Sequence, residues 1–164
     1  MAEKTMLTHL NILTDGLKRK VNALENIASI CENQRTVIES ELPLEKVREM
    51  IFGMNEEKQD SIQIVKDCDA MFEKMLADIG TELEAQQHLY KPQVKIMQEN
   101  IRRVMSIDVK IRVAEDENNK LLDARRSAEL PAAQNNGIKP KVTMPTNAAK
   151  VVDAYKQGKT IYKG

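Results

Sequence analysis

The chain has 164 residues, 30% of them charged, with equal numbers of basic and acidic side chains and no tryptophan. This length supports one domain with a real core, and the abundance of good helix formers predicts long helices or a coiled coil. There is no signal peptide and no run of about 18 apolar residues, so we expect a cytoplasmic protein without a membrane span.

The charge is unevenly distributed. Residues 131–164 contain six lysines and one acid, so this tail carries +5 and the first 130 residues carry −5. The tail has no arginine and no sizeable basic helical face, so we expect a solvated, flexible segment that does not bind nucleic acid.

The first predicted helix spans about residues 3–39. Its apolar residues recur at alternating steps of three and four, which is the pattern of a coiled-coil seam. The seam consists of Leu10, Leu13, Leu17, Val21, Leu24, Ala28, Cys31 and Ile38. Pro43 ends this helical run, because the residue before a proline avoids helical backbone angles.

A short connector helix is predicted at about residues 44–52, with Leu44, Val47 and Ile51 on one face. Gly53 suits the position just after a helix end, and Asn55 suits the N-cap of the next helix. We therefore expect a break here, followed by a second long helix over about residues 55–88.

The second long helix has a wide apolar seam, which fits a helix packed between two neighbours. The seam comprises Ile62, Val65, Cys68, Met71, Phe72, Met75, Leu76, Ile79 and Leu83. Pro92 favours a turn within residues 87–91 and a third helix over about residues 92–129. Because the apolar spacing continues in phase across this turn, one kinked helix of about 70 residues remains the alternative.

The third helix is apolar on more than one side, so more than one side has to be buried. The core face comprises Val94, Met97, Ile101 and Val104, and the surplus face comprises Met105, Ile107, Val109 and Val113. Asp108, Glu115 and Asn118 interrupt the seam; such polar residues either fix the register or mark where the seam becomes exposed. We predict an all-α, elongated antiparallel three-helix bundle, or coiled-coil hairpin, with a partner surface on the third helix.

Beyond Pro131 the composition is that of a linker. A short amphipathic helix is predicted at about residues 147–157, and a helix this short has to dock on something to be stable. The apolar residues that we assign to docking of this tail are Val151, Val152, Tyr155, Ile161 and Tyr162.

The sequence contains no convincing catalytic or metal-binding motif. Residues 158–160 resemble the end of a P-loop, but the glycine six residues before Lys159 is absent. Cys31 and Cys68 lack a CxxC pattern or a paired histidine, and we expect both to be small core hydrophobes. His88 leaves a histidine phosphotransfer domain as a remote alternative. We expect no enzyme, no metal and no cofactor.

Three runs in the third helix carry a family resemblance: residues 96–104 (IMQENIRRV), 107–111 (IDVKI) and 117–122 (ENNKLL). With the layout of a long heptad helix, a short connector and two further long helices, they make residues 5–128 resemble the FlgN-like flagellar type III export chaperones. The FliT type of secretion chaperone is a close competitor.

The resemblance implies a cytoplasmic chaperone that binds the helical terminal segments of hook-filament junction (hook-associated) proteins and delivers them to the export apparatus. It places the binding surface at about residues 101–122. Together with the surplus face, the predicted partner-binding residues are Ile101, Met105, Ile107, Val109, Ile111, Val113, Leu121 and Leu122. A homo-oligomeric coiled coil, with the surplus face used for self-association, is the alternative from another class.

Overall fold

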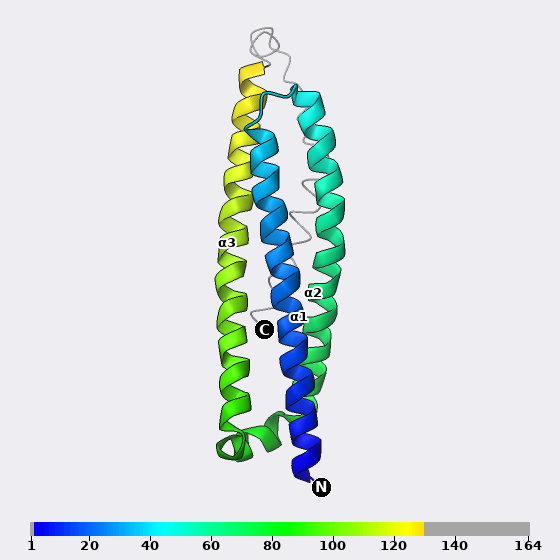
Figure 1. Ribbon diagram of the computed structural model, residues 1–164, viewed down its shortest axis with the longest axis vertical. Coiled ribbons are helices and arrows are strands. Elements are labelled where there is room, and N and C mark those ends of the chain that lie inside the picture. The colour runs from blue at the N-terminus through cyan, green and yellow to red at the C-terminus, as the bar shows by residue number, and fades with distance from the viewer. Residues whose placement is uncertain (1, 130–164) are drawn as a thin grey trace.

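The computed structural model describes residues 2–129, which form three long helices and one short 3-10 turn. The elements are α1 (Ala2–Ile38), α2 (Leu44–Gln86), η1 (Gln87–Leu89) and α3 (Lys91–Glu129). The long helices run side by side in alternating directions (Figure 1), which confirms the predicted all-α antiparallel bundle. The tail and its predicted helix at residues 147–157 lie outside the described residues.

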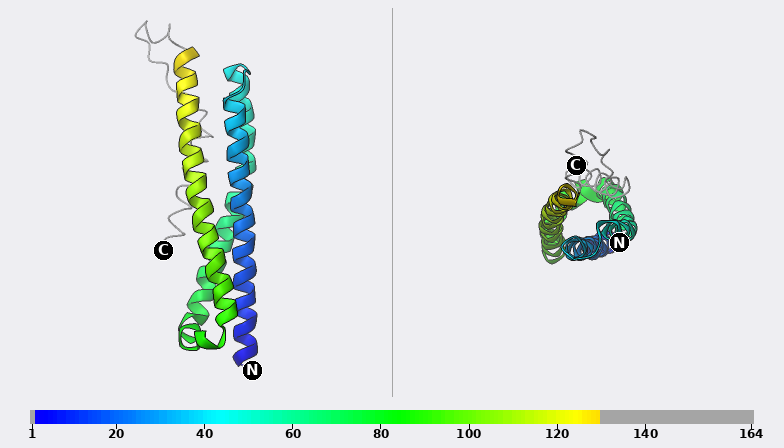
Figure 2. Two further views of the ribbon diagram at one scale, coloured as in Figure 1. Left: turned by 60° about the vertical axis from the view of Figure 1, so that its left-hand side comes forward. Right: turned by 90° about the horizontal axis from the view of Figure 1, so that it is seen from above.

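α1 is the central helix of the bundle. It packs along both α2 and α3, whereas those two outer helices make few contacts with each other. The end-on view in Figure 2 shows α1 between its two neighbours. The sequence explains this position, because Ala23, Leu24, Ile27 and Ala28 are all buried and together cover two adjacent faces of α1.

The core consists of three apolar clusters along the bundle axis, and each draws residues from α1, α2 and α3. The cluster near the turn between α2 and α3 contains Met6, Leu10, Leu13, Leu17, Ile79, Tyr90 and Met97. The middle cluster contains Val21, Leu24, Ile27, Cys31, Ile62, Val65, Val104 and Ile111. The cluster at the other end contains Val37, Ile38, Leu44, Val47, Ile51 and Leu122.

The predicted break between a connector helix and a second helix is wrong, because α2 runs without interruption from Leu44 to Gln86. Asn55 does not cap a helix; it is 2% exposed and its Oδ1 accepts a hydrogen bond from Gln34 Nε2 of α1 at 2.8 Å. A glycine inside a helix costs only about 1 kcal/mol relative to alanine. Burial of Leu44, Val47 and Ile51 in line with the rest of α2 outweighs that cost at Gly53.

The turn between the outer helices lies where it was predicted, within residues 87–91. The Tyr90 amide donates to the Gln87 carbonyl at 3.1 Å, and the Tyr90 carbonyl accepts the Val94 amide at 2.9 Å. Pro92 sits in the first turn of α3, where a missing N–H costs nothing. The alternative of one kinked helix is therefore wrong.

Polar residues at the core positions of α3 hold the helices in register. Asp108, Glu115 and Asn118 are 4–7% exposed. Asn118 Nδ2 donates to the Cys31 carbonyl of α1 at 2.9 Å. Glu115 pairs with Lys58 of α2 at 3.4 Å, with both side chains at least 96% buried. This ion pair bridges the outer helices, and only one register of α2 against α3 brings its members together.

Replacing Gly53 with alanine should stabilise the protein by about 0.5–1 kcal/mol, because Gly53 lies inside an exposed helical turn. No atom lies within 4 Å of where the new methyl group would stand. Gly16→Ala is the control and should gain less, because the Met71 methyl group occupies that space. Urea denaturation measures both changes. Destabilisation by Gly53→Ala would mean that a helix ends at residue 53.

Removing one member of the buried Lys58–Glu115 pair should destabilise the bundle by about 3–5 kcal/mol, because the remaining charge is left buried without its partner. The double variant Lys58→Met/Glu115→Leu should be close to wild type in stability. Asp116→Ala breaks an exposed pair with Lys120 and should cost less than about 1 kcal/mol. Thermal denaturation followed by circular dichroism distinguishes these outcomes. Equal losses for the single and double variants would contradict the role given to the pair.

Candidate partner-binding groove

A cavity of about 490 Å³ lies between α2 and α3, with α1 as its floor. The floor is formed by Gly16, Leu17 and Lys20. The α2 wall is formed by Cys68, Asp69, Phe72, Glu73 and Leu76, and the α3 wall by Ile101, Val104, Met105, Asp108, Val109 and Arg112. We call this cavity and the exposed side chains along its walls the groove. It exists because the outer helices both pack on α1 and make few contacts with each other.

The α3 wall presents an apolar stripe to solvent. Ile101, Met105, Val109 and Val113 are 37%, 64%, 57% and 52% exposed, respectively, and follow one another at intervals of four residues. Residues four apart lie on the same side of a helix, so the four form a continuous ridge. Leu76 on the α2 wall is 39% exposed and adds apolar surface to the other side. The groove therefore has unburied apolar surface on both walls.

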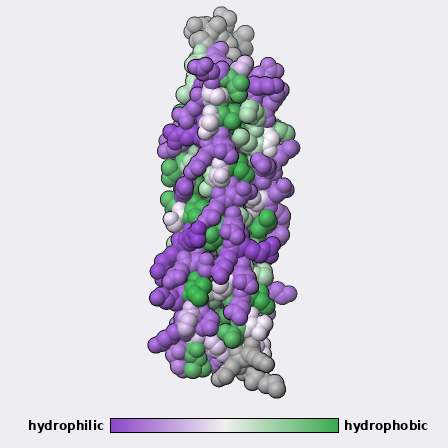
Figure 3. Space-filling model, viewed as in Figure 1, coloured by the Kyte–Doolittle hydropathy of each residue, from purple (hydrophilic) through white to green (hydrophobic). Residues whose placement is uncertain are grey.

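The opposite side of the bundle, where α1 faces outward, has a different surface. Figure 3 shows mainly hydrophilic side chains there, with hydrophobic residues scattered among them. Scattered apolar residues are normal on any soluble surface and do not by themselves indicate binding.

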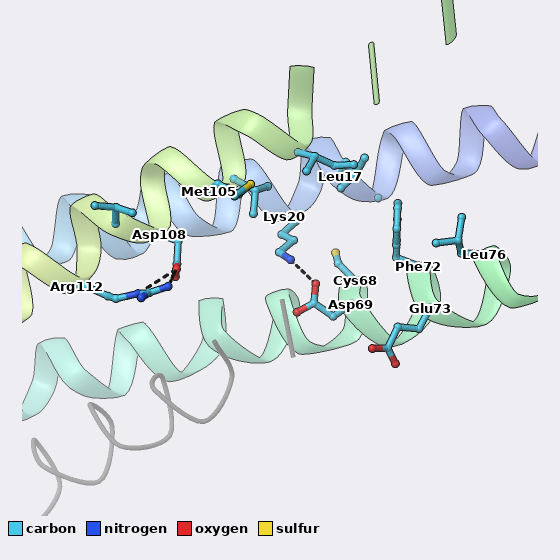
Figure 4. Close-up of a pocket in the computed structure, with 14 residues that line it drawn as sticks. Leu17, Lys20, Cys68, Asp69, Phe72, Glu73, Leu76, Met105, Asp108 and Arg112 are labelled. Atoms are coloured by element: carbon cyan, nitrogen blue, oxygen red, sulfur yellow. Dashed lines mark hydrogen bonds and ion pairs between the residues drawn. The ribbon is translucent and has the colours of Figure 1, made fainter. Parts of the chain in front are cut away.

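Two ion pairs line the groove, one between α1 and α2 and one within α3 (Figure 4). Lys20 of the floor pairs with Asp69 Oδ1 of α2. Arg112 Nε donates to Asp108 Oδ2, one turn earlier on α3, at 3.1 Å. Asp69 and Asp108 are 7% and 5% exposed. We call these four residues the polar centre of the groove.

Burial decides the protonation behaviour at this centre. Loss of water raises the pKa of Asp69 and lowers the pKa of Lys20, although their mutual ion pair opposes both shifts. Burial also raises the pKa of Cys68, so this thiol stays protonated and acts as a small apolar side chain in the wall.

The predicted partner-binding residues divide into three groups in the structure. Ile101, Met105 and Val109 line the groove, and Val113 continues their ridge. Ile107 and Leu121 are half-buried against the core. Ile111 and Leu122 are 0% and 3% exposed and belong to the core, so they present no surface to a partner.

The α2 wall and the floor were not predicted as binding residues. Phe72 and Leu76 follow a regular seam in the sequence, which gives no sign that they border an opening. Lys20 and Asp69 each look like a solvated residue beside the seam. The prediction that the wide α2 seam packs between two neighbours is wrong, because α1 holds that central position and part of the α2 seam lines the groove.

The remaining predicted features fall outside the groove. His88 is exposed in η1. Val151, Val152, Tyr155, Ile161 and Tyr162, assigned to tail docking, lie beyond the described residues. Within residues 2–129 no three His, Cys, Asp or Glu side chains cluster as a metal site would require. In the same range, no helix combines the length and apolarity needed to cross a bilayer.

Comparison of the chain with protein-family models, curated proteins and solved structures finds no match.

Aspartate at an exposed position of the ridge should leave the fold intact, whereas aspartate at a packed position should not. Val109→Asp should change the free energy of unfolding by less than about 1 kcal/mol. Ile107→Asp should cost more than about 2 kcal/mol, because Ile107 packs against the middle core cluster. Chemical denaturation measures both. Equal losses would mean that the ridge is part of the core.

Proposed function

We propose that this protein binds an amphipathic helix of another protein in the groove between α2 and α3. The single observation that supports this most directly is the exposed apolar ridge of α3 beside an open cavity. A helix placed there would contact both outer helices, and α1 would remain the floor. Laying the apolar face of a helix into a groove is a recurring mode of peptide recognition.

The size of the apolar surface is sufficient for useful affinity. The four ridge residues and Leu76 are each about one-third to two-thirds exposed. Completing their burial, with a similar number of apolar side chains on the partner, contributes roughly 1 kcal/mol per residue, or roughly 10 kcal/mol in all. Association and ordering cost several kcal/mol of this. If that cost is about 4 kcal/mol, about 6 kcal/mol remains, which corresponds to a dissociation constant of tens of micromolar.

The specific function that we propose is that of a cytoplasmic flagellar export chaperone. Its clients would be the terminal helical segments of hook-filament junction proteins, which it would keep from assembling before delivery to the export apparatus. Two points support this proposal. The sequence resembles FlgN-like chaperones, and three of the groove residues, Ile101, Met105 and Val109, fall within the segment to which that resemblance assigns client binding.

Self-association is the second candidate, because the same ridge would suit a second copy of the chain. The two candidates differ in oligomeric state. A monomer, or a weak dimer that dissociates when client is added, favours the chaperone. A stable dimer that persists in the presence of client favours the coiled-coil scaffold. Sedimentation velocity of the full-length protein gives this distinction.

The direct test measures binding of the purified chain to the terminal helical segments of the hook-filament junction proteins from the same genome, by isothermal titration calorimetry. We expect at least one segment to bind with a dissociation constant of tens of micromolar or less. The double variant Met105→Asp/Val109→Asp should weaken it at least 100-fold, because two charges would be buried against apolar side chains.

The matched control is Ile96→Asp. Ile96 is 43% exposed on the same helix, and nine residues before Met105 it lies about 180° away around α3. This variant should bind like wild type. Loss of binding in the control alone would place the client surface on the other flank of α3. Absence of binding to every such segment would contradict the flagellar proposal.

A further inference from the structure

Asp69 has one carboxylate oxygen that is not used within the bundle. Its Oδ1 pairs with Lys20, but its Oδ2 is buried and has no hydrogen-bond partner among residues 2–129. The Asp69 residue is only 7% exposed, and it lines the groove. A buried acceptor without a donor is costly, and native structures rarely retain one without a reason.

The other cation that lines the groove is already engaged. Arg112 is bound through Nε and Nη2 to Asp108 on the same helix. The charged residues that line the groove are two cations and three carboxylates: Lys20, Arg112, Asp69, Asp108 and Glu73. Glu73 is exposed on the rim one helical turn from Asp69, and its charge adds to the rise in the Asp69 pKa. The lining therefore has an excess negative charge on the α2 wall, next to the unused oxygen.

We propose that Asp69 is a specificity determinant of the groove, and that the groove selects an amphipathic helix carrying a lysine within its apolar face. The ammonium group would donate to Asp69 Oδ2, with Glu73 as a second acceptor at the rim. This inference rests on the proposed function, since it assumes that the groove binds a helix. It adds the chemistry of the partner.

Lysine fits this position better than other basic or polar residues. Its four-carbon stem can lie along apolar surface while its charged end reaches a polar group, and Phe72 and Leu76 supply such surface beside Asp69 (Figure 4). Its ammonium is a compact charge with three donors, whereas a planar guanidinium is suited to two oxygens in one plane.

Pairing at one buried polar point would also fix how the partner lies. An apolar ridge alone lets a helix slide by one turn with little penalty. A single buried polar contact penalises every register except one, as a polar core residue does in coiled coils. We therefore infer that Asp69 sets the register of the bound helix and that the ridge of α3 supplies most of the affinity.

The test uses two designed 21-residue amphipathic helical peptides that differ at one position. Both have leucines along one face, and the central residue of that face is lysine in one peptide and methionine in the other. Fluorescence polarisation measures their affinities for the full-length protein. We expect the lysine peptide to bind about tenfold tighter, because a hydrogen bond to a buried charge is among the stronger polar contacts.

Asp69→Asn should remove this preference, because the amide nitrogen that replaces Oδ2 is a donor and cannot accept from lysine. Asp78→Asn is the matched control, since it removes the same charge from an exposed position on α2 outside the groove lining. It should keep the tenfold preference. If Asp69→Asn does not fold, Glu73→Gln, at the exposed rim, should still reduce the preference about twofold to threefold.

The two proposals can fail separately. If both peptides bind wild-type protein equally, the inference about Asp69 is overturned and the groove remains a helix-binding site. If neither peptide binds, or if Met105→Asp/Val109→Asp leaves their binding unchanged, the proposal of a helix-binding groove is itself overturned.

Other occupants of the groove give different results. If a peptide of residues 141–164 displaces the designed peptides and binds more tightly than they do, the groove belongs to this chain's own tail. A dimer that dissociates as peptide binds would assign it to a second copy. Either result would overturn the choice of a foreign partner.

Discussion

The whole structure depends on the two-sided burial of α1. An ordinary amphipathic helix buries one stripe, but α1 has apolar residues across two adjacent faces, with Ala23, Leu24, Ile27 and Ala28 all buried. Each face requires its own neighbour, so α2 and α3 both pack along α1 and make few contacts with each other. The groove between the outer helices follows from that arrangement. It is the space between the two helices that pack on α1, and no further helix is needed to form it.

Buried polar contacts add specificity to this packing. Apolar seams with repeating spacing permit several registers of similar energy. The Lys58–Glu115 pair, the Gln34–Asn55 hydrogen bond and the Asn118 contact with the Cys31 carbonyl each exist in only one register. Buried ion pairs contribute little net stability compared with apolar residues of the same shape. Their effect in this bundle is to exclude the alternative alignments.

Much of the fold could be predicted from the sequence, because heptad spacing and proline positions are local signals. The seam of α1, the turn near Pro92 and the antiparallel arrangement follow from them. The predicted break at Gly53 was wrong. A glycine followed by an asparagine resembles a helix boundary, and the sequence does not show that Asn55 is buried against Gln34.

At the groove, sequence periodicity identified Met105 and Val109 as surplus apolar residues. It could not identify Asp69 or Lys20, because their role depends on which helix faces which. It also could not distinguish Ile111, which is buried, from its exposed neighbours.

Under the proposed function, the position of the Lys58–Glu115 bridge determines how a helix would enter the groove. The groove lies between two connections of the outer helices: the covalent turn at η1 and this buried ion pair farther along the bundle. A helix cannot be threaded in from either end while both connections stay intact, so entry must be sideways, from the open flank between α2 and α3. Lateral entry does not require the partner helix to have a free end, so a helix in the middle of a longer chain could also bind.

The two connections limit the length of the bound helix. The stretch of α3 between Lys91 and Glu115 is about 36 Å long at the helical rise, so the bound portion of a helix is at most about 24 residues.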